Sequence, residues 1–106
     1  MAKYEVYLVS YRTGKRLPQL VPGANTLTGA RRKAYKLVSH DDVGVSGIVF
    51  NKDGRFKAEI YKFKDASVGI IAGEVCNTVS DERYWYPDDG GKYKLYKDGS
   101  LGKRLR

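Results

Sequence analysis

Residues 25–39, NTLTGARRKAYKLVS, decide the fold that this sequence predicts. Their apolar side chains follow one another at spacings of three, four, three and one, which places them on one face of a helix with about 3.6 residues per turn. These side chains are Leu27, Ala30, Ala34, Leu37 and Val38. Cationic side chains occupy much of the remaining surface, at Arg31, Arg32, Lys33 and Lys36. We therefore predict a helix whose apolar face packs on a sheet and whose cationic face meets water.

The start of this helix is marked by side chains that can cap it. Asn25, Thr26 or Thr28 can supply an oxygen to the free backbone amides of the first turn. Glycine inside a helix costs about 1 kcal/mol relative to alanine. Gly29 therefore indicates either close packing or a helix that starts near Thr28.

Alternating residues predict strands on both sides of the helix. Residues 4–11, YEVYLVSY, alternate with a period of two, and because both faces are largely apolar we expect a central strand. Residues 46–50 and 55–63 flank a turn of Asn, Asp and Gly types and predict a hairpin. Further strands are expected at 67–75, where Gly69 and Gly73 indicate a bulge or a close backbone approach, at 83–86 and at 93–96; residues 101–106 are either a short edge strand or a frayed end.

The remaining segment, residues 17–24, contains two prolines and predicts an irregular connector, because proline lacks the amide that a central strand needs. We expect its Leu17, Leu20 and Val21 to lie under an edge of the sheet. Together these segments predict an α+β fold, with residues 1–106 forming a single domain. Its mostly antiparallel sheet of five or six strands carries one helix on one face, in the order β-α-β-β-β-β-β.

Charge is the strongest global feature of the sequence. Twenty Lys and Arg against 12 Asp and Glu give a net charge of +8, a balance that favours polyanions such as nucleic acid or an acidic protein surface. Residues 65–82 contain four acids and no Lys or Arg, whereas residues 83–106 contain seven Lys and Arg. Solubility alone accounts for part of this excess.

Cations and aromatic rings are interleaved near the C-terminus. Rings can stack on unpaired bases while neighbouring Lys and Arg neutralise phosphates. Tyrosine is also a good strand former whose hydroxyl can reach water, which explains the same composition without a ligand. The residues predicted to contact nucleic acid are Arg31, Arg32, Lys33, Lys36, Arg83, Tyr84, Trp85, Tyr93, Lys94, Tyr96, Lys103 and Arg104.

Catalytic, metal and membrane signals are weak. The chain has one histidine, His40, beside Asp41 and Asp42, where a loop residue is expected rather than a catalytic base. It has one cysteine, Cys76, expected as a small buried side chain in a strand. Asp88 and Asp89 lack the spacing of a calcium loop. Residues 1–12 do not resemble a signal peptide, and no apolar stretch approaches the roughly 20 residues of a membrane span. We expect a cytoplasmic protein without cofactor or metal and without enzymatic activity.

Function is a hypothesis at this point. We expect a non-enzymatic module that binds DNA or RNA through the cationic helix face and the tyrosine-rich C-terminal hairpin. The alternative is a small accessory protein, of phage or mobile-element type, that docks on an acidic protein partner. A metal-independent ribonuclease using Lys, Arg, Tyr and the lone His is a more remote alternative, because no spacing singles out any of these residues.

Overall fold

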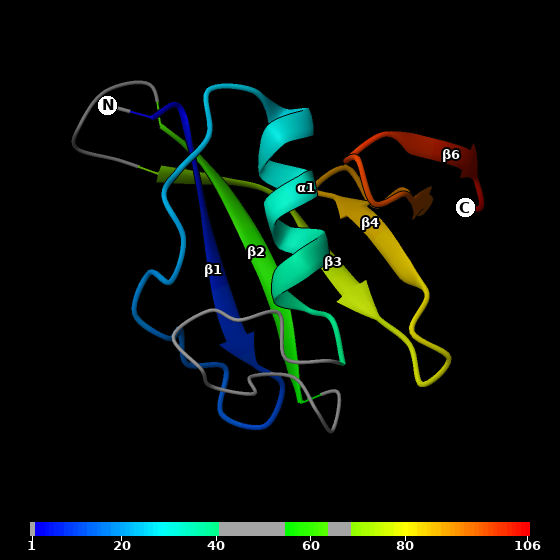
Figure 1. Ribbon diagram of the computed structural model, residues 1–106, viewed down its shortest axis with the longest axis horizontal. Coiled ribbons are helices and arrows are strands. Elements are labelled where there is room, and N and C mark those ends of the chain that lie inside the picture. The colour runs from blue at the N-terminus through cyan, green and yellow to red at the C-terminus, as the bar shows by residue number, and fades with distance from the viewer. Residues whose placement is uncertain (1, 41–54, 64–68) are drawn as a thin grey trace.

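The computed structural model describes residues 2–40, 55–63 and 69–106. These residues form one helix and a six-stranded antiparallel sheet, in the predicted order β-α-β-β-β-β-β (Figure 1). The elements are β1 (Tyr4–Ser10), α1 (Leu27–Leu37), β2 (Phe56–Phe63), β3 (Gly69–Asn77), β4 (Arg83–Pro87), β5 (Tyr93–Leu95) and β6 (Leu101–Arg104). The strands lie in the sheet in chain order, so each pairs with the next. The α+β prediction is therefore confirmed, and the expected strand at residues 46–50 lies outside the described residues.

Helix α1 crosses one face of the sheet, over β1, β2 and β3 (Figure 1). It begins after Thr26, whose hydroxyl accepts a hydrogen bond from the amide of Gly29 at 3.0 Å. Gly29 thus lies in the first turn, which agrees with the predicted alternative of a helix that starts near Thr28. At the other end, the side-chain amide of Asn77 donates to the carbonyl oxygen of Val38 at 2.6 Å. This bond ties the C-terminal end of the helix to β3.

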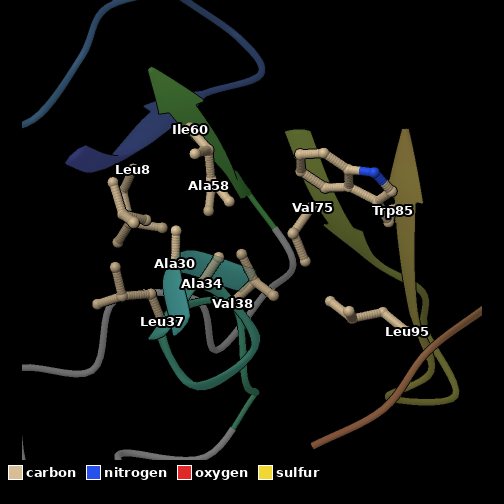
Figure 2. Close-up of a cluster of buried hydrophobic side chains, with 11 residues drawn as sticks. Leu8, Ala30, Ala34, Leu37, Val38, Ala58, Ile60, Val75, Trp85 and Leu95 are labelled. Atoms are coloured by element: carbon tan, nitrogen blue, oxygen red, sulfur yellow. The ribbon is translucent and has the colours of Figure 1, made fainter. Parts of the chain in front are cut away.

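The core lies between α1 and the sheet (Figure 2). Ala30 and Ala34 are fully buried, as the helical spacing predicts. Trp85 joins this core from β4 and packs over Gly73, where a Cβ atom would lie 2.5 Å from the ring carbon Cη2. A register shift in the β2–β3 pairing falls beside Gly73. Both expected consequences of that glycine, a bulge and a close approach, are present.

Strand β1 is an edge strand, and the expectation of a central strand was wrong. The connector that precedes α1 covers its outer edge in place of a neighbouring strand. Tyr4 and Ala24 exchange two backbone hydrogen bonds of 2.9 Å, and the amide of Leu17 donates to the carbonyl oxygen of Leu8. The predicted apolar side chains of this connector do pack against the core, at Leu17, Leu20 and Val21.

Candidate nucleic-acid interface

The sheet has one face under α1 and another that we call the open face. Because side chains alternate along a strand, the buried Arg83 and Trp85 on the helix side place Tyr84 and Tyr86 on the open face. The same alternation places Tyr7 of β1 there. The open face is therefore the part of the sheet where tyrosine rings can meet a ligand.

A row of side chains crosses the first half of the open face. Tyr7 pairs with Glu59, Glu59 with Glu74, and Glu74 with Tyr86. Opposed carboxylates repel each other, and Lys57 compensates for this: its Nζ lies 2.5 Å from Glu74 Oε2 and 3.9 Å from Glu59 Oε2. Burial opposes the charged form of Lys57, but the hydrogen bond and the attraction to Glu74 raise its pKa.

The tyrosines of this half are engaged by nearby charged groups. The hydroxyls of Tyr7 and Tyr61 donate to Glu5 and Glu59, each at 2.6 Å. Their rings meet edge to face with centroids 6.0 Å apart, and the guanidinium of Arg16 lies 4.3 Å from the Tyr7 centroid. The hydrogen bond to Glu5 raises the pKa of Tyr7, while burial and the bond to Glu59 raise the pKa of Tyr61 to about 12. This half of the face is an internally paired network.

The second half of the open face combines rings with cations. We call Tyr84, Tyr86, Lys92, Lys94, Tyr96 and Arg106 the C-terminal strip. Lys92 Nζ lies 4.6 Å from the ring centroid of Tyr84 and 5.8 Å from that of Tyr86. Lys94 Nζ lies 5.2 Å from the Tyr84 centroid, and the guanidinium carbon of Arg106 lies 5.7 Å from the Tyr86 centroid. Rings and cations far apart in the chain are thus in contact.

Tyr96 extends the strip toward β6. A Cβ atom on Gly102 would lie 2.8 Å from Cε2 of Tyr96 and 3.1 Å from Cβ of Lys94. The ring of Tyr96 and the side chain of Lys94 therefore share one face of the β5–β6 hairpin. Tyr96 is 50% exposed, so much of its ring surface is open to a ligand.

The cations of the strip outnumber the acidic side chains that form ion pairs with them. Within the described residues it forms one ion pair, between Lys94 Nζ and Glu82 Oε2 at 3.3 Å. Glu82 also accepts a hydrogen bond from the hydroxyl of Tyr84 at 2.9 Å. The bonds from Tyr84 and then Lys94 lower the pKa of Glu82. Lys92 and Arg106 contact rings instead of carboxylates, which keeps their charge available to an anion.

Three of the predicted contact residues are buried, and we remove them from the candidate site. Trp85 is 2% exposed in the core. Arg31 is 9% exposed, and its Nε donates to the carbonyl oxygen of Gly99 at 2.9 Å. Arg83 is 6% exposed and lies 3.2 Å from the carboxylate of Asp81. Trp85 belongs to the core, and the two arginines bind partners within the fold because a charge inside a protein needs a fixed partner.

The remaining helix cations lie on the other side of the sheet from the strip. Arg32 and Lys36 are exposed, whereas Lys33 Nζ donates to the carbonyl oxygens of Pro22 and Gly23 at 2.8 Å each. Tyr84 and Lys94 project from the opposite face. The sheet therefore separates the exposed cations of α1 from Tyr84 and Lys94.

The other predicted residues lie on the C-terminal hairpin. Tyr93 packs against the core with part of its ring exposed, and the guanidinium carbon of Arg104 lies 5.6 Å from its centroid. Lys103 is exposed. Tyr93 pairs with the buried Trp85, so Tyr93 and the Arg104 guanidinium beside it lie on the helix side of the sheet, and none of the three residues belongs to the strip.

Sequence reasoning missed three members of the strip. Tyr86 follows Tyr84 by two residues, and the period of a strand could have placed both on one face. Lys92 and Arg106 carry no such signal, because their backbones meet only through the β5–β6 pairing, where the Lys92 amide donates to the Arg106 carbonyl oxygen at 3.3 Å. Long-range pairing brings them to the rings.

The single histidine and the single cysteine both lie partly buried in the fold. His40 is partly buried, and its Nδ1 lies 3.8 Å from Asp81 Oδ1. Cys76 lies partly buried on β3, where burial raises the pKa of its thiol. Across residues 2–40, 55–63 and 69–106, no cluster of three or more His, Cys, Asp and Glu side chains is placed to bind a metal ion. Over the same residues, no helix combines the length and the apolar character of a membrane span.

Comparison with known protein families, with curated proteins and with solved structures finds no match to this chain.

Proposed function

We propose that this protein binds single-stranded nucleic acid along the C-terminal strip. The observation that carries the proposal is the position of Lys92, whose Nζ lies within 6 Å of the ring centroids of both Tyr84 and Tyr86. Tyrosine rings would stack on the bases, and Lys92, Lys94 and Arg106 would meet the phosphates. This combination of aromatic platforms and cations is what binding of single strands requires.

The cations over the rings do not block stacking. An exposed lysine over an aromatic ring contributes about 0.5–1 kcal/mol, whereas a stacked base contributes roughly 1–3 kcal/mol. A base can therefore displace the lysine, whose flexible side chain then reaches the adjacent phosphate. The rings favour single strands, because the faces of paired bases are covered by their neighbours.

The distribution of charge makes the C-terminal strip a better site for phosphates than the first half of the open face. In the first half, Glu5, Glu59 and Glu74 bind the tyrosine hydroxyls and Lys57. A phosphate there would meet three carboxylates, which repel it. In the strip, Glu82 engages Lys94, while Lys92 and Arg106 contact rings.

The second candidate function is docking on an acidic protein, and the cationic face of α1 supports it. Helix α1 contains no acidic residue, and Arg32 and Lys36 form no ion pair within the described residues. This cationic face lies on the other side of the sheet from the strip. The two candidates therefore use different surfaces and can be tested separately.

The test compares two double charge reversals that change the net charge equally. Fluorescence anisotropy with labelled single-stranded DNA and RNA, at several salt concentrations, measures the affinity. The wild type should bind with an affinity that falls steeply with the logarithm of salt concentration. Lys92→Glu with Lys94→Glu should abolish most of this binding, while Arg32→Glu with Lys36→Glu should retain most of it.

Each other outcome contradicts the proposal. Greater loss in the helix variant would place the nucleic acid on α1. Equal loss in both variants would mean that net charge alone drives binding. Absence of binding by the wild type would favour the acidic protein partner, which cross-linking to a polyglutamate peptide would test.

A further inference from the structure

A pocket opens beside the C-terminal strip and is acidic, unlike the strip itself. It has a volume of about 220 Å³ and is lined by Ile71, Gly73, Glu74, Tyr86, Pro87 and Asp88. Tyr86 belongs to both the pocket and the strip. A ligand stacked on the Tyr86 ring would therefore contact both the pocket and the C-terminal strip.

Backbone irregularities build the pocket. The register shift beside Gly73 interrupts the regular pairing of β2 and β3. On the other side, the turn after β4 is fastened by two hydrogen bonds, from the amide of Asp88 to the carbonyl oxygen of Ala72 at 3.2 Å and from Gly90 to Pro87 at 3.1 Å. Regular strands would leave the surface flat, so the bulge and the turn together create a hollow.

The size and chemistry of the pocket restrict its ligand. Pockets for drug-sized ligands measure roughly 300–1,000 Å³, so 220 Å³ suits one planar ring system rather than a whole nucleotide. Glu74 supplies a carboxylate that Lys57 holds at 2.5 Å through Oε2. An ionised carboxylate has two oxygens and can accept several hydrogen bonds, so Glu74 can accept from a ligand while Lys57 fixes its position.

We propose that this pocket holds a guanine base, with Tyr86 beneath its ring and Glu74 accepting hydrogen bonds from its Watson–Crick edge. This inference rests on the proposed binding of single-stranded nucleic acid. Lys92 and Arg106 lie 5.8 and 5.7 Å from the Tyr86 centroid and would meet the phosphates of the same nucleotide. The pocket would then determine which base is preferred at one position of the bound strand.

Guanine is favoured over the other bases by its hydrogen-bond donors. Its N1–H and N2 amino group are adjacent and point the same way, which matches the two oxygens of a carboxylate. Adenine and cytosine each offer one amino group beside an acceptor nitrogen, and that acceptor would face the negative charge. Uracil offers a single N–H between two carbonyl oxygens. Bases splayed from a single strand are read on this edge by side chains that also stack on them.

Glu74, rather than Asp88, is assigned as the group that reads the base. Glu74 lies on a strand, is partly buried and is held by Lys57. Asp88 is exposed in the turn after β4. Replacing either with its amide removes one negative charge from the same pocket, which makes Asp88→Asn a matched control for Glu74→Gln.

The test uses labelled oligouridines that carry one central guanine, inosine, adenine or uracil. The wild type should prefer guanine over adenine by between about fivefold and a hundredfold, with inosine, which lacks the N2 amino group, in between. Glu74→Gln should remove this preference, and its affinity for oligouridine should match that of Asp88→Asn. Asp88→Asn should keep the preference for guanine.

The outcomes separate this inference from the proposed function. Binding of every oligonucleotide with equal affinity would overturn the guanine site and leave the strip in place. Loss of the preference in Asp88→Asn but not in Glu74→Gln would also overturn the assignment of Glu74. Failure of the wild type to bind any of the oligonucleotides would overturn both proposals.

Discussion

Tyr84 on β4 and Lys94 on β5 are direct cross-strand partners, and Lys94 Nζ lies 5.2 Å from the centroid of the Tyr84 ring. The carboxylate of Glu82 accepts a hydrogen bond from both side chains. A ring, a cation and the anion that orients them therefore lie together on the open face. This small network fixes the middle of the C-terminal strip.

Binding should depend on the ring of Tyr84 and not on its hydroxyl. Tyr84→Ala removes the stacking surface and should weaken binding of single-stranded nucleic acid between about fivefold and a hundredfold. Tyr84→Phe removes only the bond to Glu82 and should bind within about twofold of the wild type. Anisotropy titrations of both variants check this. Equal loss in the two variants would show that the hydroxyl, and not stacking, makes the contact.

The docking of the C-terminal turn on α1 should depend on Gly99. Gly99 has a φ of +90°, and a Cβ atom there would collide with the carbonyl oxygen of Thr28. Gly90 has a φ of +93° with nothing within 4 Å of the same position. Gly90→Ala should cost about 1–2 kcal/mol of unfolding free energy for its backbone conformation alone, and Gly99→Ala about 2–5 kcal/mol. Urea denaturation measures both, and equal costs would mean that the turn does not pack on the helix.

Acid should weaken the cluster around Asp81. Partial burial opposes its charged form, but the hydrogen bond from Asn77 and the attraction of Arg83 outweigh it and lower the pKa of Asp81. A lowered pKa in the folded state stabilises the fold above the ordinary aspartate value of about 3.9, and this contribution disappears as pH falls through the lower value. Asp81→Asn should therefore be less stable than the wild type near neutral pH, and the difference should shrink in acid.

Asparagine suits this comparison because Asp81 has a φ of 62°, a conformation that asparagine tolerates. Urea denaturation of both proteins across the acid range gives the two pH profiles. A constant difference between them would show that the charge of Asp81 does not stabilise the fold.

The buried face of α1 gives a direct test of the core. Ala34 is fully buried, so Ala34→Asp would place an unpaired charge among apolar side chains and should cost more than about 4 kcal/mol. Arg32→Asp introduces the same side chain on the exposed face and should cost far less. Circular dichroism and urea denaturation compare the variants. A stable Ala34→Asp variant would mean that this helix does not pack on the sheet through Ala34.

Local patterns were sufficient for the helix and most of the strands in the described residues, but they did not show which strands lie at the edges of the sheet. The spacing of Ala30, Ala34 and Leu37 predicted their burial, because helical periodicity is a property of neighbouring residues. The place of β1 at an edge was not predictable in this way. Its outer edge is covered by a connector that the pattern marked only as irregular.

The sequence predicted the residue types of the candidate site, but it did not predict which of these residues share a face. Tyr84, Lys94 and Tyr96 share one face, while Trp85 and Arg83 alternate with Tyr84 and are buried. The period of two along β4 implies that its residues cannot all face one ligand. Which of the two faces is buried depends on where α1 packs.

By itself, the sequence determined the helix, most of the strands and the excess of positive charge, because each follows from residues close together in the chain. Only the tertiary structure decided which cations are available. Arg31 is buried and donates a hydrogen bond to Gly99, 68 residues away. Lys92 instead stays at the surface, close to two tyrosine rings. The physical reason is that burial of a charge depends on whether a distant backbone or side chain can replace its water.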